Sequence, residues 1–249
     1  MKAIITGGAG FIGSHLVDLL VQKKYEVIVI DNFSTGRDSN LLHLKKKIII
    51  KKANISRIGN WKSLFLGVDV VFHLAAQADI VPSIKKPKSY FNSNVAGTIN
   101  ILDLCVKNNV KKIVYAASSS CYGIPKYYPT KETSKLSPEY PYALTKFLGE
   151  ELVMHWAKVY NLSSVSLRFF NVFGTRSRTS GTYGAVLGVF LKQKLSNSPF
   201  TVVGNGKQKR DFTYVTDIAN ALYLASRYKK TNIFNVGSGK PKSINYLVK

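Results

Sequence analysis

A tyrosine and a lysine four residues apart, Tyr142 and Lys146 in the segment PYALTK, are well suited to acid–base chemistry. On a helix, residues with this spacing share one face, so the ammonium group of the lysine can approach the phenol. A phenol has an ordinary pKa of about 10, and a neighbouring positive charge favours the phenolate. Such a pair is common by chance, but on a helix that follows a strand–helix–strand half of the chain it favours a tyrosine that takes a proton from a substrate hydroxyl.

Three consecutive serines, Ser118 to Ser120, follow the apolar run KKIVYAAS and precede the Tyr122-Gly123 pair. A serine triplet is typical of a polar linker. The same hydroxyls, placed at the end of a strand and upstream of a helix that carries Tyr142, are also suited to hydrogen-bond a reacting group. The triplet by itself leaves both interpretations open.

The N-terminal segment KAIITGGAGFIGSHLVDLL places glycines between a strand and a helix. Their spacing satisfies both G-x-G-x-x-G and G-x-x-G-x-x-G, which permits a tight turn, a close approach of backbone to pyrophosphate, and close packing of the helix on the strand. The free N–H groups of the helix N-terminus favour phosphate. An ordinary strand–helix turn that binds nothing is the alternative. The glycines of this turn are Gly7, Gly8, Gly10 and Gly13.

Asp31 closes the second strand, EVIVID. A carboxylate at this place can accept hydrogen bonds from both hydroxyls of an adenosine ribose, and it repels a 2′-phosphate. Arg37 is the nearby residue that would hold such a phosphate. Because Asp31 occupies the deciding position, the sequence predicts NAD as the cofactor rather than NADP. The Lys146 ammonium together with the positive nicotinamide ring of NAD⁺ would favour the Tyr142 phenolate and move the pKa of this tyrosine towards physiological pH.

The composition predicts a soluble protein with one large core, since 45% of the 249 residues are hydrophobic. The only cysteines, Cys105 and Cys121, form no disulfide framework, which suits a reducing cytoplasm. The four histidines are scattered, so we expect no metal site. We also expect no signal peptide and no membrane-spanning segment.

The formal net charge is +23, from 36 Lys and Arg against 13 Asp and Glu. Such a balance raises the question of nucleic-acid or membrane-surface binding. The lysines come in short pairs and triplets between apolar runs, as at Lys45 to Lys47 and Lys111-Lys112. We therefore expect solvated surface charge, with a general attraction for polyanionic small ligands and no sequence-specific binding of nucleic acid.

Apolar runs alternate with helical patterns along the chain, which predicts an α/β fold with a Rossmann-like, doubly wound parallel sheet. We expect an NAD-binding domain at 1–171, to which the chain returns at about 211–236. Residues 172–210 and 237–249 are expected to form a small C-terminal substrate-binding lobe that ends early. The expected strands are KAIIT, EVIVID, KKIII, VDVVFHLA, KKIVYAAS, SSVSLRFF and NIFNVG, and the clearest helices span Ser14 to Lys23, Val95 to Asn108 and Tyr142 to Tyr160.

The ordered motifs of the chain resemble those of the extended short-chain dehydrogenase/reductases, in the branch of NAD-dependent nucleotide-sugar epimerases and dehydratases. The resemblance runs from Ile4 to about Leu247. The motifs that carry it are TGGAGFIG, VIDNFSTG, FHLAAQ, NVAGT, SSSCYG, PYALTK, LRFFNVFG, RDFTYVTD and NVGSG.

The resemblance implies a role for individual residues. Ser118 would hydrogen-bond the reacting sugar hydroxyl, Tyr142 would be the base, and Lys146 would hold the nicotinamide ribose. Relatives usually carry an acid where this chain has Asn54, so the adenine contact differs there. The implied cofactor-binding residues are Gly7, Gly10, Phe11, Ile12, Gly13, Asp31, Asn32, Ser34, Thr35, Gly36, Asn54, Ile55, Leu74, Ala75, Ala76, Gln77, Ser93, Asn94, Tyr142, Lys146 and Phe170. The implied substrate-binding residues are Ser83, Ser119, Ser120, Asn171 and Arg210.

The identity of Ser119 and Ser120 narrows the reaction. Dehydratases and decarboxylases of similar fold carry Glu, often Asp-Glu, at these two positions. Elimination of water requires an acid for the leaving hydroxyl and a base for the adjacent C–H proton, and serine hydroxyls are poor at both. The sequence therefore predicts an NAD-dependent epimerase of a nucleoside-diphosphate sugar, inverting C4 of a UDP-hexose through a 4-keto intermediate.

Two other functions remain open. One is a nucleotide-sugar reductase or dehydratase of the same family, and the other is a catalytically retired NAD-binding protein that serves as an interaction module. The helices near 95–108 and 142–160 resemble those that pair into a four-helix interface in the family, so we expect a homodimer. Relatives commonly continue beyond the position of Lys249, and the sequence does not identify the sugar.

Overall fold

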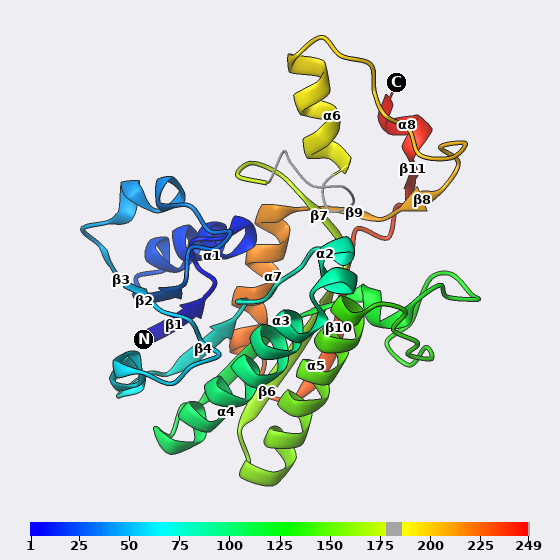
Figure 1. The fold of residues 1–249 in the computed structure, drawn as a ribbon. Coiled ribbons are helices and arrows are strands. Elements are labelled where there is room, and N and C mark those ends of the chain that lie inside the picture. The colour runs from blue at the N-terminus through cyan, green and yellow to red at the C-terminus, as the bar shows by residue number, and fades with distance from the viewer. Residues whose placement is uncertain (178–185, 249) are drawn as a thin grey trace.

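The computed structural model, which describes residues 1–177 and 186–248, is built on a seven-stranded sheet in the order β10-β6-β5-β4-β1-β2-β3 (Figure 1). All neighbouring strands in this sheet pair in parallel. The strands are β1 (Lys2–Thr6), β2 (Glu26–Asp31), β3 (Ile48–Lys52), β4 (Val70–His73), β5 (Lys112–Ser118), β6 (Ser163–Phe169) and β10 (Asn232–Val236).

The strand order reverses between β1 and β4. Strands β2 and β3 follow β1 towards one edge of the sheet, and β4, β5, β6 and β10 follow one another towards the opposite edge. In open parallel sheets a ligand binds beyond the carboxyl ends of the strands at such a reversal. The turn after β1 and the loop after β4 are therefore the places where this topology offers a binding crevice.

Helices cover both faces of the sheet (Figure 1). On one face α1 (Phe11–Gln22) packs against α7 (Val215–Arg227), and their apolar sides enter a common core with β1, β2 and β6. On the other face α4 (Gly97–Lys107) and α5 (Pro141–Tyr160) lie side by side over a second core cluster. These continuous apolar strands are typical of a parallel sheet that is buried on both sides.

Shorter elements connect this framework. The loop after β4 contains α2 (Ile80–Lys85), α3 (Pro87–Phe91) and a π-helical turn (Asn92–Ala96) that runs directly into α4. A 3-10 turn (Ser119–Tyr122) follows β5. Further 3-10 turns lie at Asp38–Asn40, Leu42–Leu44 and Asn60–Phe65.

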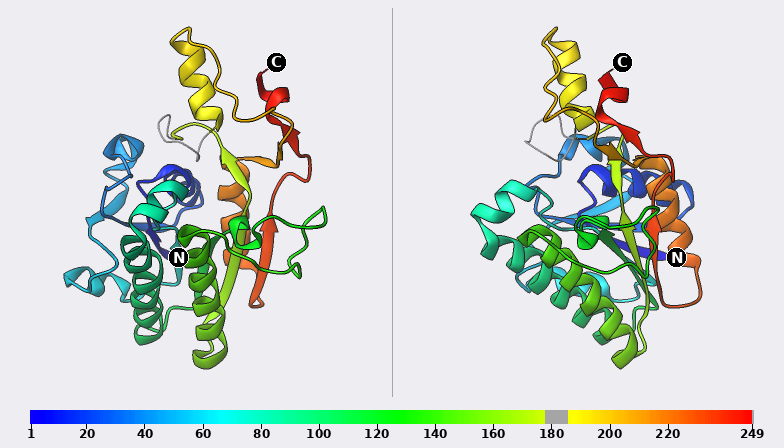
Figure 2. Two further views of the ribbon diagram at one scale, coloured as in Figure 1. Left: turned by 45° about the vertical axis from the view of Figure 1, so that its right-hand side comes forward. Right: turned by 90° about the vertical axis from the view of Figure 1, so that its right-hand side faces the viewer.

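The remaining described elements lie beyond the carboxyl ends of the strands (Figures 1 and 2). A short strand β7 (Asn171–Phe173) pairs in parallel with β9 (Phe212–Tyr214), and β8 (Lys209–Arg210) pairs antiparallel with β11 (Lys242–Ser243). Helices α6 (Val186–Leu195) and α8 (Ile244–Val248) complete this end of the molecule. Among the described helices, none has the length and apolar character needed to cross a membrane.

The predicted Rossmann-like α/β fold is confirmed, and each of the seven expected runs overlaps a strand of the sheet. The helices α2, α3, α6, α7 and α8 were not among the expected elements. The division into an NAD-binding domain and a substrate lobe stays a prediction, and residues 178–185 and 249 of the expected lobe lie outside the described residues.

A buried ion pair joins α5 to β6. The Nη2 group of Arg168 lies 2.5 Å from Oε1 of Glu150, and both side chains are at most 3% exposed. The same carboxylate accepts a hydrogen bond of 2.7 Å from Ser166, and Nη1 of Arg168 donates to the hydroxyl of Tyr122 at 2.7 Å. The pair therefore locks the helix that carries Tyr142 to the strand beside β5.

We expect Arg168→Met to lower the free energy of unfolding by about 3–5 kcal/mol, because the variant leaves the charge of Glu150 buried without its partner. The control is Lys111→Met, which removes the ion pair of a lysine side chain that is 78% exposed and lies 2.6 Å from Asp69. Such an exposed pair contributes about 0–1 kcal/mol. Urea unfolding followed by circular dichroism measures both, and similar losses in the two variants would contradict the role assigned to Arg168.

Candidate active site

The predicted catalytic residues meet at the end of β5. Ser118 is the last residue of this strand, and Tyr142 and Lys146 lie in the first turns of α5, which begins with Pro141 in a position that suits proline. The hydroxyl of Ser118 hydrogen-bonds the phenol of Tyr142. The hydroxyl of Ser120 donates to Oγ of Ser118 at 2.8 Å, so the three oxygens form one chain that is directed towards Tyr142.

Lys146 is 5% exposed, and its Nζ lies 4.3 Å from the centre of the Tyr115 ring. Tyr115 can approach α5 this closely because residue 149 is glycine. A Cβ atom there would lie 2.2 Å from the Tyr115 hydroxyl oxygen. Burial lowers the pKa of Lys146 to about 7, against the opposing charge of Glu150 one turn further along the helix.

Burial governs the pKa of Tyr142 in the chain alone. Burial raises the pKa of the phenol, and the hydrogen bond from Ser118 opposes this effect without cancelling it. The carboxylate of Asp79 raises the pKa of Tyr142 further. The predicted lowering counted the nicotinamide ring together with the Lys146 ammonium, so it stays a prediction for the protein with NAD bound; in the chain alone the loss of solvent raises the pKa. Ionisation of Tyr142 thus requires additional positive charge, of the kind a nicotinamide ring carries.

The glycine turn after β1 has the close contacts that its spacing predicted. Gly7 has φ of +74°, and a Cβ atom on Gly13 would lie 2.2 Å from the carbonyl oxygen of Gly7. Gly10 precedes α1 without any side-chain cap, so Phe11 and Ile12 begin a helix whose first N–H groups have no acceptor within it. This end of α1 can therefore donate to a phosphate.

Asp31 is 7% exposed and organises two segments at the end of β2. Its Oδ2 accepts from the backbone N–H of Ala9 at 2.9 Å, and its Oδ1 accepts from that of Phe33 at 2.8 Å. Burial raises the pKa of this carboxyl group, and the backbone hydrogen bonds oppose the rise. The predicted cofactor residues Asn32, Ser34, Thr35 and Gly36 follow directly in the loop after Asp31.

A cavity of about 750 Å³ opens beside this loop. It brings together four of the predicted cofactor-binding residues, Asn32, Asn54, Gln77 and Ser93. Four cations that sequence reasoning did not assign to the site also line it, namely Arg57, Lys85, Lys86 and Lys88. The sequence did not indicate this placement. Lys85, Lys86 and Lys88 line the cavity because they lie at the junction of the short helices α2 and α3.

Asn54 directs its side chain to its own loop, where Oδ1 accepts from the backbone N–H and hydroxyl of Ser56 at 3.0 and 2.9 Å. Its neighbour Ile55 is buried against Gly97. Asn94 reaches the strand end Leu74–Gln77, since its Oδ1 accepts from the N–H of Gln77 at 2.8 Å.

The predicted substrate-binding residues differ in burial and in their position in the fold. Ser83 is fully buried, and its hydroxyl donates to the carbonyl of Ile80, so it turns into α2 rather than outwards. Ser119 and Ser120 are partly exposed in the turn after Ser118. Asn171 and Arg210 lie beyond the sheet on β7 and β8, and both are exposed.

The loop around Arg210 is held by its neighbour. Both carboxylate oxygens of Asp211 accept hydrogen bonds of 2.7 Å from the turn at Ser238 and Gly239. The carbonyl of Asp211 accepts from the Nδ2 group of Asn171 at 3.1 Å. Phe170 precedes Asn171 and donates its N–H to the carbonyl of Val236, which places it at the end of β10.

Comparison with known proteins agrees with this site. Residues 3–237 match the NAD dependent epimerase/dehydratase family. The chain belongs to this family. This result confirms the family resemblance seen in the sequence, and with it NAD as the cofactor.

Three individual relatives illustrate the family. A Methanocaldococcus jannaschii protein provisionally named UDP-glucose 4-epimerase is 39% identical, over 98% of this chain and 79% of its own. The UDP-N-acetyl-alpha-D-glucosaminuronate decarboxylase of Bacillus cytotoxicus is 36% identical, over 98% and 77%. The structure of a UDP-N-acetylglucosamine 4-epimerase from Methanobrevibacter ruminantium M1, in complex with UDP-N-acetylmuramic acid, superposes with a TM-score of 0.96 at 35% identity, covering 99% of this chain and 79% of that one.

The residues of this family member fit NAD. The crowded glycine turn leaves room for a pyrophosphate, Asp31 lies at the ribose position of the fold, and the adjoining cavity can take an adenosine. These placements of individual contacts remain predictions.

We expect Asp31→Ala to weaken NAD binding and to reduce the preference for NAD over NADP. The variant removes a ribose acceptor and the carboxylate that holds the N–H of Ala9 in the phosphate turn. The control is Glu26→Ala, which removes an exposed carboxylate at the opposite end of the same strand. Isothermal titration with NAD and NADP measures the effect. Equal affinity of the unaltered protein for both dinucleotides would contradict the prediction.

Lys146 should leave a pH signature in protein freed of NAD. Its folded pKa of about 7 lies below the ordinary lysine pKa of 10.5, so the unfolded chain binds more protons than the folded chain between these values. Stability should therefore rise with pH across this window, relative to a Lys146→Met variant in which the group is absent. Thermal unfolding from pH 7 to 10 tests the difference. Lys158→Met, an exposed position on the same helix, should show the wild-type slope.

Proposed function

We propose that the protein is an NAD-dependent epimerase that inverts C4 of a UDP-hexose through a 4-keto intermediate. The observation that carries this proposal is the directed hydroxyl chain from Ser120 through Ser118 to Tyr142. It supplies hydrogen bonding and a proton acceptor at one point, which is what oxidation and re-reduction of a secondary alcohol require.

In this reaction the phenolate of Tyr142 takes the proton of the C4 hydroxyl, and Ser118 holds the same hydroxyl in place. Bound NAD supplies the redox chemistry by accepting the C4 hydride and giving it back. Tyr142 returns its proton to the oxygen after the 4-keto sugar has turned within the site. Lys146 supplies positive charge that favours the phenolate when Tyr142 accepts the proton. NAD is regenerated, so the net reaction is an isomerisation.

The substrate assignment is supported by the names of the relatives. The three proteins compared above are named for reactions of UDP-sugars, and two of them are named as 4-epimerases. Arg210 suits a phosphate of such a substrate, because a guanidinium offers a fork of donors. Asn171 and the turn held by Asp211 lie beside it at the same end of the molecule.

A decarboxylase or dehydratase of the same family is the second candidate. The decarboxylase from Bacillus cytotoxicus favours it, and so does Asp79, whose charge acts on Tyr142. Such reactions use acidic groups next to the catalytic serine, where this chain has Ser119 and Ser120. The epimerase therefore ranks first. A catalytically retired protein ranks lower, because Ser118, Tyr142 and Lys146 are all present and assembled.

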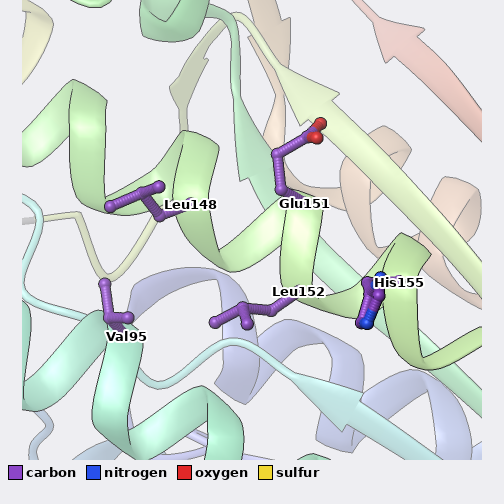
Figure 3. Close-up of a pocket in the computed structure, with 5 residues that line it drawn as sticks. All are labelled: Val95, Leu148, Glu151, Leu152 and His155. Atoms are coloured by element: carbon purple, nitrogen blue, oxygen red, sulfur yellow. The ribbon is translucent and has the colours of Figure 1, made fainter.

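We further propose a homodimer that forms through α4 and α5, in the cytoplasm. A cavity of about 340 Å³ is lined by Val95 of the π-helical turn that leads into α4 and by Leu148, Glu151, Leu152 and His155 of α5 (Figure 3). Its apolar side chains are only partly covered within one chain. The two buried, free cysteines suit a reducing compartment.

The chemical proposal predicts that Tyr142→Phe abolishes nearly all turnover but keeps NAD bound, because only the ionisable oxygen is lost. Ser118→Ala should cost less, about 10²–10³-fold, as is usual when one positioned donor is removed. The test incubates the protein with UDP-, dTDP-, GDP- and CDP-hexoses and identifies the products by NMR. Interconversion of C4 epimers without net change in NADH is expected. A dehydrated or decarboxylated product would contradict the proposal.

The dimer proposal predicts that Leu148→Glu produces monomers, because the charge would be buried in an apolar interface. Lys158→Glu on the same helix serves as the control for added negative charge at an exposed place. Light scattering coupled to size exclusion gives the mass of each. A monomeric unaltered protein would refute the proposed interface.

A further inference from the structure

A row of buried polar side chains crosses the sheet beneath the catalytic residues. It starts at Thr6, the last residue of β1, passes through His73, the last residue of β4, and reaches Thr98 in α4. All three side chains are at most 1% exposed. Oγ1 of Thr6 lies 2.7 Å from Nδ1 of His73, and Nε2 of His73 lies 2.9 Å from Oγ1 of Thr98.

The donors and acceptors allow one arrangement of protons in this row. The hydroxyl of Thr98 contacts the carbonyl of Asn94 at 2.6 Å, and a carbonyl can only accept. Oγ1 of Thr98 must therefore accept from His73, which places the imidazole proton on Nε2. In the neutral ring Nδ1 is then an acceptor, so Thr6 donates to it. Oγ1 of Thr6 in turn accepts from the N–H of Ala75 at 3.2 Å.

The surroundings keep this imidazole neutral. Burial, together with the charge of Lys146, lowers the pKa of His73 to about 3. The ring of Tyr115, which also lies under Lys146, has its centre 5.6 Å from that of His73. A second proton would make His73 positively charged, next to the buried ammonium group of Lys146.

The row ends in the catalytic helix. Asn94, whose carbonyl accepts from Thr98, lies in the π-helical turn before α4, and its Nδ2 group donates to Gln77 O at 2.9 Å and to Thr145 Oγ1 at 3.0 Å. Thr145 directly precedes Lys146, and its hydroxyl donates to the carbonyl of Tyr142 at 2.9 Å. A continuous set of directed hydrogen bonds thus runs from β1 to the backbone between the two catalytic residues.

We propose that His73 is a positioning residue, a neutral hub with its proton fixed on Nε2 that holds the glycine turn, the strand end at Ala75 to Gln77 and the start of α5 in one arrangement for NAD. Thr6 immediately precedes Gly7, and Gln77 and Asn94 border the predicted nicotinamide side. The three parts of the cofactor site are therefore set by one hydrogen-bonded unit. The proposal rests on the proposed function only in taking NAD as the ligand and Tyr142 and Lys146 as its catalytic neighbours.

The first test observes the proton directly. Protein labelled with ¹⁵N-histidine is studied by NMR from pH 5 to pH 9, and the His73 signals are identified by their loss in His73→Gln. We expect the pattern of a neutral ring protonated on Nε2, unchanged over the whole range. A His73 ring that is protonated on Nδ1, or that titrates between pH 5 and 9, would overturn the proposal.

The second test measures coupling. Thr6→Val and Thr98→Val keep the side-chain shape and each remove one end of the row. Each should lower NAD affinity about tenfold, because a buried partner is left unpaired. If the row acts as one unit, the double variant should lose little more than either single variant, whereas independent sites add. Fully additive losses, or no loss at all, would refute the hub.

A matched control separates positioning from general stability. Ser164→Ala removes a hydroxyl that is equally buried and that donates to Leu162 O at 2.8 Å at the start of β6. It should lower the melting temperature but leave NAD affinity unchanged. A loss of NAD affinity equal to that of Thr98→Val would mean that the row acts only through stability, against the proposal.

These readouts need no sugar substrate. If no sugar nucleotide is epimerised but the tautomer and the coupling are found, the proposed reaction fails and the role of His73 stands. If C4 epimers interconvert but His73 titrates or the losses add, the role of His73 fails and the reaction stands. His73→Gln gives an intermediate case, since its amide N–H can replace Nε2–H towards Thr98, and it should retain more NAD affinity than His73→Phe.

Discussion

The ammonium group of Lys146 is buried, and its environment determines how the rest of the site responds to charge. A buried cation is costly unless charge or hydrogen bonding compensates it. Glu150 lies one turn along α5 and supplies the nearest negative charge, but Arg168 neutralises that carboxylate through an ion pair of 2.5 Å. Lys146 is thus left with the face of Tyr115 at 4.3 Å and a pKa close to neutrality. A group in this state responds strongly to any further charge that enters.

The polar network around Lys146 explains why the backbone there is irregular. Asn94 lies in the π-helical turn at Asn92–Ala96, and its side chain hydrogen-bonds both Gln77 and Thr145. Such π-helical turns occur frequently at functional sites. Gly149 admits the hydroxyl of Tyr115 against α5. Irregular segments of this kind are retained where a site needs them. Here each one brings a polar group to the ends of β1, β4 or β5.

Much of this arrangement could be predicted from sequence, because its signals are local. Continuous apolar runs fix the strands, the glycine spacing fixes the turn before α1, and the i, i+4 spacing places Tyr142 and Lys146 on one face. The order of the motifs gave the family. Parallel strands then bring the ends of β1, β2, β4 and β5 to one edge of the sheet, so Asp31 and Ser118 lie along the same edge without any further signal.

The features that sequence reasoning missed depend on tertiary burial or on very short elements. The helices α2 and α3 span six and five residues, which is too short for a periodic pattern, so the inward turn of Ser83 and the placement of Lys85 and Lys88 at the cavity were not seen. The raised pKa of Tyr142 follows from the burial of its side chain, and the spacing of residues in the sequence does not indicate burial. His73 was read as one of four scattered histidines, because its partners Thr6 and Thr98 are remote in sequence.

The charges of the site explain how one tyrosine can act in both directions of a reaction. Within the chain alone, burial and Asp79 keep Tyr142 protonated, and Ser118 offers the one hydrogen bond that opposes them. An oxidised nicotinamide adds positive charge and favours the phenolate, whereas a reduced one is neutral and favours the phenol. The protonation state of Tyr142 would therefore follow the redox state of the cofactor beside it. An epimerase needs this coupling, because the oxygen at C4 must lose its proton when hydride leaves and regain it when hydride returns.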